Sequence, residues 1–231
     1  MLVLNTALIQ SVGAQAPTVV LMFSGGRDSS LAALRLAAAG VRLVLVTISA
    51  SHLVGVDSVR ARVRELAAHL PLTTPWIRIS QPQDIGADTS FYERTCLPCH
   101  HAYIVASAAV CRALGLHHVA LGYVSYQGGW PEQTLPAITR LRSVLGRYGL
   151  TLLLPVYDVS AQGQAEVELT NSGLSPTSLE QKCLLQVSNI VLSSGRLDQQ
   201  LELWEHAINH SMASISELQL DVLEVASLAN A

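Results

Sequence analysis

The feature that most constrains the fold is a short apolar segment that breaks at two glycines and continues into a helical pattern. Residues 19–23 read Val-Val-Leu-Met-Phe, residues 24–30 read Ser-Gly-Gly-Arg-Asp-Ser-Ser, and residues 31–36 read Leu-Ala-Ala-Leu-Arg-Leu. A short apolar run that ends at glycine is typical of a buried strand followed by a turn. The sequence therefore predicts a strand, a tight loop and a helix in direct succession.

This succession is suited to binding phosphate. The first N–H groups of a helix have no partner within the helix, and the helix dipole favours an anion there. Gly25 and Gly26 let the backbone approach an anion without an intervening side chain. Arg27 can add positive charge, and Asp28 can hold a magnesium ion or cap the helix. The simpler alternative is a strand-to-helix turn that binds no ligand.

Residues 24–30 resemble the Ser-Gly-Gly-x-Asp-Ser loop of the PP-loop ATP pyrophosphatases. They differ from a Walker A loop, because no Gly-Lys-Ser/Thr follows, and from a dinucleotide fingerprint, because the third glycine is missing. The resemblance implies that ATP is cleaved between its α and β phosphates, that a substrate oxygen becomes adenylated, and that a nucleophile then displaces AMP. It implies ATP and Mg²⁺ as cofactors and catalytic roles for Ser24, Arg27 and Asp28. The implied phosphate contacts are Ser24, Gly25, Gly26, Arg27, Asp28, Ser29 and Ser30.

Composition indicates a chain with a large buried core and without a broad basic surface. Half of the 231 residues are hydrophobic, 13% are charged, and the net charge is −3. No apolar run approaches the roughly 18–20 uncharged residues of a membrane helix. Residues 13–16 faintly resemble a signal-peptidase site, but no basic region precedes them, and Asn5 and Thr6 interrupt the apolar segment. We therefore expect a cytoplasmic protein with a short edge strand near its N-terminus.

Apolar strands alternate with helical patterns through the first two thirds of the chain. Strands are predicted at 19–23, 41–49, 76–80, 117–123 and 150–156, and helices at 28–39, 56–70, 96–114 and 134–148. Continuous apolar strands that alternate with helices are typical of a parallel sheet covered on both faces. The fold class is therefore α/β, a Rossmann-like five-stranded parallel sheet, with the expected strand order 3-2-1-4-5. Ligands bind at the carboxyl edge of such sheets, where Thr47, Ser49 and Gly122 are predicted to contact the nucleotide.

The C-terminal third reads as helical only. Helices are predicted at 162–172, 177–192 and 196–227, with glycines at 173 and 195 as breaks. We expect two parts, an α/β nucleotide-binding domain at 1–160 and a C-terminal helical extension at 161–231. The extension can pack on the sheet or on a second subunit, as in a homodimer.

The cysteines form a second candidate site. Cys96 and Cys99 make a Cys-x-x-Cys where a loop enters a helix, and two thiolates at this spacing suit one metal ion or one redox event. Cys183 is the natural third ligand, because residues beyond the fifth strand fold back towards the mouth of the sheet. Three cysteines with an open position suit zinc or an iron–sulfur cluster. The alternative is a structural role for all three. Cys111 lies among apolar helical residues and is predicted to be a core residue.

Two families of PP-loop enzymes are similar to this chain. The first is 7-cyano-7-deazaguanine synthase of queuosine biosynthesis, which resembles nearly the whole chain. That family has a Tyr-Pro-Asp segment, to which Trp130-Pro131-Glu132 is similar, and a cysteine where Cys183 falls. The resemblance implies that Trp130 stacks on a guanine-like base and that Glu132 binds its N1–H and amino group. It also implies zinc, but the cysteine cluster of that family is absent after Cys183.

The second family is that of the PP-loop tRNA thiolation enzymes. Some of these hold a 4Fe-4S cluster with a Cys-x-x-Cys and one distant cysteine, as in Cys96, Cys99 and Cys183. This resemblance implies a tRNA partner and a sulfurtransferase reaction, although no RNA-binding appendage or basic tail is visible. A third interpretation is a catalytically silent ATP-binding partner subunit. The sequence favours an adenylating ligase or synthase that acts on a small nucleobase-like substrate, closest to the deazaguanine synthase type.

Overall fold

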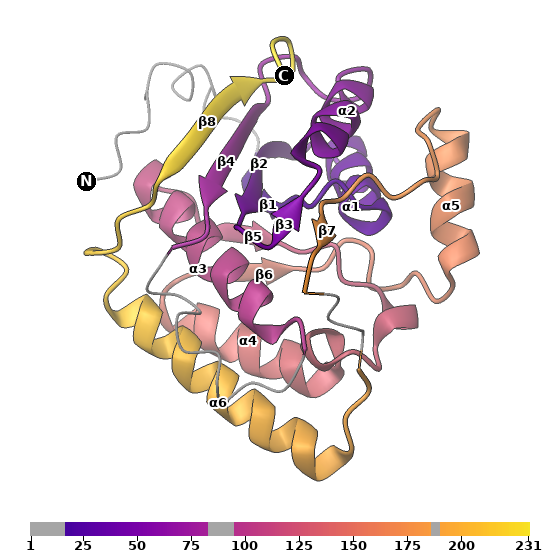
Figure 1. Ribbon diagram of the computed structural model, residues 1–231. Helices are drawn as coiled ribbons and strands as arrows, with labels where there is room; N and C mark the ends of the chain where they lie inside the picture. The colour runs from indigo at the N-terminus through magenta and orange to yellow at the C-terminus, as the bar shows by residue number, and fades with distance from the viewer. Residues whose placement is uncertain (1–16, 83–94, 186–189) are drawn as a thin grey trace.

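A six-stranded, mostly parallel sheet forms the centre of the computed structural model, which describes residues 17–82, 95–185 and 190–231 (Figure 1). The strand order is β6-β5-β1-β2-β4-β8. The edge strand predicted near the N-terminus lies outside the described residues. The strands are β1 (Thr18–Met22), β2 (Arg42–Ser49), β4 (Pro75–Ser80), β5 (His118–Ala120), β6 (Thr151–Leu153) and β8 (Val222–Ser227).

The five strands predicted from the sequence form the parallel part of the sheet in the predicted order. β1 lies at the centre, paired in parallel with β2 on one side and β5 on the other. Leu21 is the partner of Leu45 in β2 and of Ala120 in β5, and all three side chains are fully buried. Because parallel strands end at one edge, the loop after β1 opens beside the segments that follow β2 and β5.

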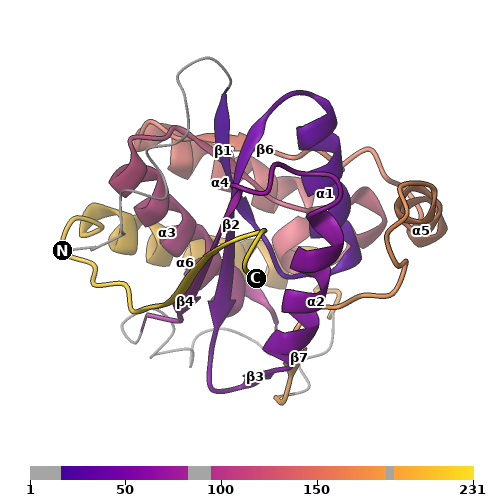
Figure 2. The ribbon, with the colours of Figure 1, turned by 90° about the horizontal axis from the view of Figure 1, so that it is seen from above.

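Helices cover both faces of this sheet (Figure 2). Helices α1 (Arg27–Ala38), α2 (Val56–Leu66) and α5 (Gln162–Asn171) lie on one face, and α3 (Leu97–Leu114), α4 (Leu135–Arg147) and α6 (Ser194–Ala213) lie on the other. Two apolar clusters correspond to these two layers. In the second layer, the indole of Trp204 on α6 is buried and donates to the carbonyl of Leu97 at 3.1 Å. This bond fixes α6 against the start of α3.

The C-terminal region differs from the all-helical prediction. The helix predicted at 196–227 ends at Ala213, and Val222–Ser227 forms β8, which pairs antiparallel with the edge strand β4. Glu224 binds the guanidinium groups of Arg60 at 2.6 Å and Arg78 at 3.2 Å. The helical pattern was misleading here because pairing with the open edge of β4 satisfies the backbone of this segment, whatever its local propensity.

The helix predicted at 177–192 is also wrong for the part of it that the structure describes. Residues 178–181 are neither helical nor part of a strand, and β7 (Lys182–Cys183) pairs antiparallel with the two-residue strand β3 (Leu53–Val54) after β2. Neither strand is predicted by the sequence, because each has only two residues and needs the other to form. Within the described ranges, no helix combines the length and apolarity needed to cross a membrane.

Candidate functional site

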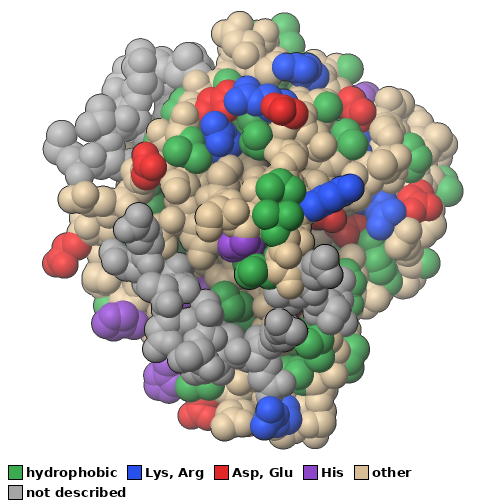
Figure 3. Space-filling view, in the orientation of Figure 1, with side chains coloured by type: hydrophobic (Ala, Val, Ile, Leu, Met, Phe, Trp, Pro, Cys, Tyr) green, Lys and Arg blue, Asp and Glu red, His purple; other side chains and the backbone are tan. Residues whose placement is uncertain are grey.

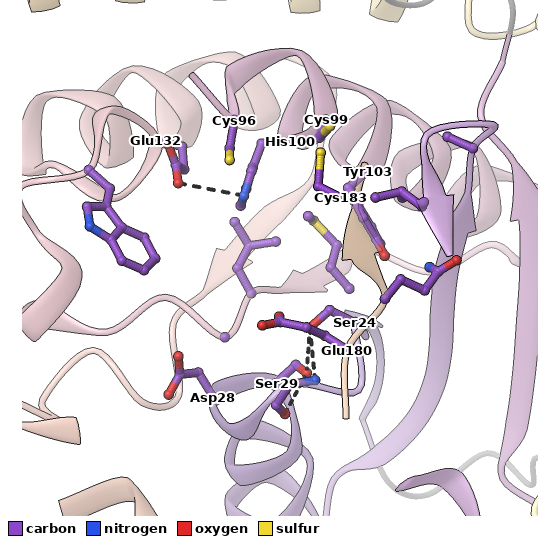
Figure 4. A pocket seen from close by; sticks show the side chains of 18 of the residues that line it. Ser24, Asp28, Ser29, Cys96, Cys99, His100, Tyr103, Glu132, Glu180 and Cys183 are labelled. Carbon is purple, nitrogen blue, oxygen red and sulfur yellow. Dashed lines mark hydrogen bonds and ion pairs between the residues drawn. The ribbon is translucent and has the colours of Figure 1, made fainter. Parts of the chain in front are cut away.

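An open cavity of about 1580 Å³ lies at the carboxyl edge of the parallel strands. The loop between β1 and α1 lines one end of it, and the three cysteines predicted to act together line the other (Figure 4). Most of the residues predicted to bind ligands therefore surround one space.

The phosphate loop, residues 24–30, is held in shape by its own polar groups. Ser24 Oγ accepts from the N–H of Gly26 at 3.1 Å and lies 3.2 Å from Ser29 Oγ. The hydroxyls of Ser29 and Ser30 donate to the carbonyl of Gly26 at 3.2 and 2.6 Å. Gly25 has a φ of +81°, which glycine adopts without strain. The predicted strand, loop and helix are confirmed, and hydrogen bonds within the loop stabilise its conformation.

Asp28 is the central acidic group of the loop. Tyr126 donates its hydroxyl to Oδ1 at 2.7 Å, and the amide of Gln127 donates to Oδ2 at 3.3 Å. Burial raises the pKa of Asp28, while the bond from Tyr126 and the charge of Arg27 oppose that rise. Arg27 in turn binds Glu166 on α5 at 2.8 Å. Asp28 is thus oriented into the cavity as a hydrogen-bonded carboxylate and does not cap α1.

Gly122 positions the phosphate loop through a close backbone contact. It follows β5 and lies against the first turn of α1, where a Cβ atom on residue 122 would meet Ser29 N at 2.7 Å and the carbonyl carbon of Asp28 at 2.9 Å. Only glycine permits this approach. Gly122 also lines the cavity, as predicted, but its visible role is to pack the end of β5 against α1.

Thr47 and Ser49 do not line the cavity. Thr47 is fully buried, donates to the carbonyl of Phe23 at 2.6 Å and accepts from the indole of Trp76 at 2.9 Å. These bonds connect β2 to the end of β1 and to β4. In this structure the hydroxyl of Thr47 supports the sheet beneath the loop, and its predicted contact with a nucleotide finds no support in the geometry.

The three cysteines predicted to cooperate face the cavity. Cys96 precedes α3, Cys99 lies in its first turn, and Cys183 lies on β7. Burial raises the pKa of Cys96 to about 12 and that of Cys99 to about 11, with smaller contributions from the negative charge of Glu132 and from the other thiols. Cys99 Sγ lies 3.5 Å from Nε2 of His52, a residue that sequence reasoning did not connect with this site. The remaining cysteine, Cys111, is buried in the core as predicted.

These thiols do not form a preassembled metal site. In the part of the chain that the structure describes, no group of three or more His, Cys, Asp or Glu side chains is placed to hold a metal ion. Soft thiolates suit zinc and iron–sulfur clusters. Cys96, Cys99 and Cys183 line the same cavity but are not placed around one point that could hold such a group. The prediction of zinc therefore gains no support from the arrangement.

Glu132 is a buried acceptor without a full set of donors. It is 2% exposed, its Oε2 has no hydrogen-bond partner among the described residues, and its Oε1 lies 3.9 Å from Nε2 of His100. His100 Nδ1 lies 2.8 Å from the hydroxyl of Tyr123, and burial lowers the pKa of His100 so that the ring is neutral at pH 7. Trp130 lines the same part of the cavity. A ligand with N–H groups would satisfy the free carboxylate oxygen.

Glu180 is the site residue that sequence reasoning missed entirely. It lies in the segment 178–183, which connects to the phosphate loop through a hydrogen bond from Leu179 N to the carbonyl of Gly25 at 3.2 Å. Desolvation raises the pKa of Glu180, and the charge of Asp28 adds to that rise. The helix predicted over these residues hid the role of this segment. The sequence offered one signal for this site residue, a carboxylate in the polar stretch just before the candidate ligand Cys183.

Comparisons with known proteins establish the fold. The chain matches no protein-family model and no curated protein sequence. It is similar to a solved 4-thiouridine synthetase in a complex with RNA and ATP, with 16% identity and a TM-score of 0.62 over 90% of this chain and 55% of that chain. The chain thus spans about half the length of that synthetase. At this level of identity the similarity shows that the two proteins share a fold.

Two further solved structures align with lower scores. The U34-tRNA thiolase NcsA from Methanococcus maripaludis, solved with its 4Fe-4S cluster, has 10% identity and a TM-score of 0.49 over 92% of this chain and 77% of that chain. The NMN synthetase from Francisella tularensis has 12% identity and a TM-score of 0.38 over 90% of this chain and 92% of that chain.

Proposed function

We propose that this chain is an ATP-dependent adenylating enzyme of nucleobase or tRNA modification, and that the modification is the insertion of sulfur. One observation carries the proposal: the phosphate loop and three cysteine thiols open into the same cavity. An adenylated substrate atom and a sulfur nucleophile must meet for sulfur to replace oxygen. The 4-thiouridine synthetase whose fold this chain shares was solved with ATP and RNA, which supports the same class of reaction.

In the first step, a carbonyl oxygen of the base attacks the α-phosphorus of ATP, and pyrophosphate leaves. The backbone of the phosphate loop and the first turn of α1 hold the phosphates, since their N–H groups point towards an anion at this position. Asp28 faces the cavity and holds Mg²⁺, which neutralises phosphate charge when it is bound. Catalysis then rests on positioning and on electrostatic stabilisation of the departing pyrophosphate.

In the second step, a sulfur nucleophile displaces AMP from the adenylated carbon. Cys96, Cys99 and Cys183 all face the cavity that holds the nucleotide, and one of them, loaded as a persulfide by a sulfane-sulfur donor, can attack the carbon through its outer sulfur while the C–O bond to AMP breaks. A second thiol then attacks the inner sulfur, forms a disulfide and leaves the outer sulfur on the base, and an external thiol reduces the disulfide. His52 beside Cys99 can accept the thiol proton as the sulfur becomes nucleophilic. Because the thiols form no metal site as arranged, no part of this step is assigned to a metal.

We propose that one base of the substrate enters the cavity. If that base belongs to a tRNA, the rest of the tRNA makes few contacts with charged side chains on the surface of this protein. Lys and Arg side chains are scattered among Asp and Glu on the face shown in Figure 3. Arg35 binds Glu168, and Arg140 binds Glu205 and Asp198, so that much of the positive charge is already paired. A broad electrostatic footprint for nucleic acid is not seen on this face.

The experiment combines ATP, Mg²⁺, a persulfide donor, a thiol reductant and bulk tRNA with protein purified without oxygen. AMP release and thiolated nucleosides are measured by chromatography and mass spectrometry. We expect both products from the wild type and from Cys111→Ala, a matched control in the core. Cys183→Ser should lose the thiolated nucleoside. ATP binding without AMP release would contradict the proposal and identify a partner subunit instead.

Elemental analysis of the same protein addresses the metal. Iron with acid-labile sulfide would show that the thiols gather around a 4Fe-4S cluster and would strengthen the assignment to sulfur insertion. About one zinc per chain would favour the deazaguanine synthase type. If the protein contains neither iron nor zinc, the thiols themselves remain as the sulfur carriers.

A second candidate function is 7-cyano-7-deazaguanine synthesis, which the free carboxylate oxygen of Glu132 beside Trp130 favours. A guanine-like edge presents two adjacent donors, N1–H and the amino group, which match one carboxylate. In this reaction ATP adenylates the carboxylate of 7-carboxy-7-deazaguanine, and ammonia displaces AMP to give the amide. A second ATP then adenylates the amide oxygen, and loss of two protons and of AMP, which carries that oxygen away, leaves the nitrile. Formation of the nitrile by the wild type and its loss in Glu132→Gln would establish this function in place of sulfur insertion.

A further inference from the structure

The segment 178–183 presses a carboxylate against the phosphate loop. A Cβ atom on Gly26 would lie 2.8 Å from Oε2 of Glu180 and 3.4 Å from Oγ of Ser178. A Cβ atom on Gly25 would lie 3.1 Å from the carbonyl oxygen of Leu179. Nothing larger than a hydrogen atom fits between this segment and the two glycines. In Figure 4 the carboxylate of Glu180 projects into the space between the loop and the thiols.

Phosphate oxygens need that same space. A phosphate bound by the loop must come within about 3 Å of its N–H groups, and the two glycines exist to allow that approach. Glu180 already places a negative group on the open side of the loop, with Asp28 as a second carboxylate nearby. Arg27 supplies local positive charge but is bound to Glu166. A triphosphate that enters this site meets two carboxylates, and Glu180 must move away to admit it.

We propose that Glu180 is an internal competitor of the triphosphate, a residue that holds the phosphate loop closed until nucleotide displaces it. This inference rests on the proposed function, because it takes residues 24–30 to be the ATP site.

Hydrogen bonds hold both ends of the segment that contains Glu180. At its start, the buried guanidinium of Arg62 donates to the carbonyl of Thr177 at 2.5 Å, and Glu65 accepts from Ser175 N at 3.4 Å. At its end, β7 pairs Cys183 with Leu53. The anchor at Cys183 is a ladder of only two residue pairs, so displacement of Glu180, three positions earlier, strains this pairing. Entry of the nucleotide would in this way loosen Cys183 from its place beside β3.

The first test measures the affinity for α,β-methylene ATP, which cannot be cleaved between the α and β phosphates, by calorimetry in EDTA. Glu180→Gln keeps the size of the side chain and removes its charge, and Glu180→Asp withdraws the charge by one methylene. Glu202→Gln, an exposed position on α6, is the matched control. We expect Glu180→Gln to bind about tenfold more tightly than the wild type. Glu180→Asp should lie between the two, and Glu202→Gln should match the wild type.

The results separate this inference from the proposed function. Equal or weaker binding by Glu180→Gln, with clear binding by the wild type, would overturn the inference and leave the ATP site intact. No binding by any of the proteins, either in EDTA or with Mg²⁺ present, would overturn both. Binding by Glu180→Gln alone would support the inference in its strongest form.

The second test follows Cys183 by alkylation with N-ethylmaleimide and peptide mass spectrometry. The analogue should raise the rate at Cys183 at least about threefold in the wild type, while Cys111 stays unreactive. Simple shielding by a nucleotide in the cavity would lower that rate. An unchanged or lowered rate at Cys183 would overturn the coupling between the nucleotide and this cysteine.

Discussion

Gly122→Ala tests whether the close contact between the end of β5 and the start of α1 sets the position of the phosphate loop. The added methyl group would lie 2.7 Å from Ser29 N and 2.8 Å from its Cα. Both are backbone atoms of a buried residue, so that no side chain can rotate away. The first turn of α1 would have to retreat by about 0.7 Å to restore an ordinary contact of 3.4 Å. Overpacking of this kind costs roughly 1–3 kcal/mol, and we expect a loss of about 2–3 kcal/mol.

The matched control is Gly146→Ala in α4, where an added Cβ meets nothing within 4 Å. Alanine favours a helix over glycine by roughly 0.5–1 kcal/mol, so this variant should be slightly more stable than the wild type. Urea unfolding gives both free energies, and calorimetry with α,β-methylene ATP reports on the loop. Gly122→Ala should be less stable and should bind the nucleotide more weakly than the wild type, whereas Gly146→Ala should bind it as the wild type does. Stability and affinity in Gly122→Ala equal to those of the wild type would refute the reasoning.

Two further predictions follow from the hydrogen bonds around the site. Tyr126→Phe removes a bond that opposes the raised pKa of Asp28, so that this pKa should rise further. Because Asp28 acts as the carboxylate, AMP formation is lost as pH falls through its pKa, and the acid limb of the pH–rate profile should move to higher pH. An unmoved acid limb would count against a catalytic Asp28. Thr47→Val leaves the Trp76 indole and the Phe23 carbonyl unpaired in the core, which should lower the free energy of unfolding by roughly 1–3 kcal/mol. Nucleotide affinity should be unchanged in this variant, and a large loss of affinity would restore Thr47 to the binding site.

The parallel part of the fold follows from local sequence patterns. Each parallel strand is a continuous apolar run, and each is followed by a turn and a helical pattern, so that the topology rules for such units leave few arrangements. The phosphate loop is local in the same sense, because Ser24, Gly26 and Ser29 bond to one another within six residues. Features of this kind can be predicted from one sequence.

The remaining features depend on partners that are distant in the chain. β8 forms because β4 offers an open edge some 145 residues earlier, and β7 forms because β3 lies opposite it. Residues 178–183 read Ser-Leu-Glu-Gln-Lys-Cys and residues 222–227 read Val-Leu-Glu-Val-Ala-Ser, and the Leu, Ala and Glu among them favour a helix in the absence of a visible partner strand. The sequence did not reveal Glu180 as a site residue, because its position beside Gly26 depends on the pairing of β7 with β3. Thr47 was expected at the ligand because it lies near the end of a strand, but its hydroxyl bonds inwards to Phe23 and Trp76.

The products of ATP turnover test the central claim most directly. ATP labelled at the α-phosphate is incubated with the protein, Mg²⁺ and bulk tRNA or a nucleobase pool, and the labelled products are separated by chromatography. Asp28→Asn serves as the inactive control and should keep the stability of the wild type. The account predicts labelled AMP, with an equal amount of pyrophosphate, from the wild type alone. Labelled ADP with free phosphate, or equal AMP from Asp28→Asn, would contradict it.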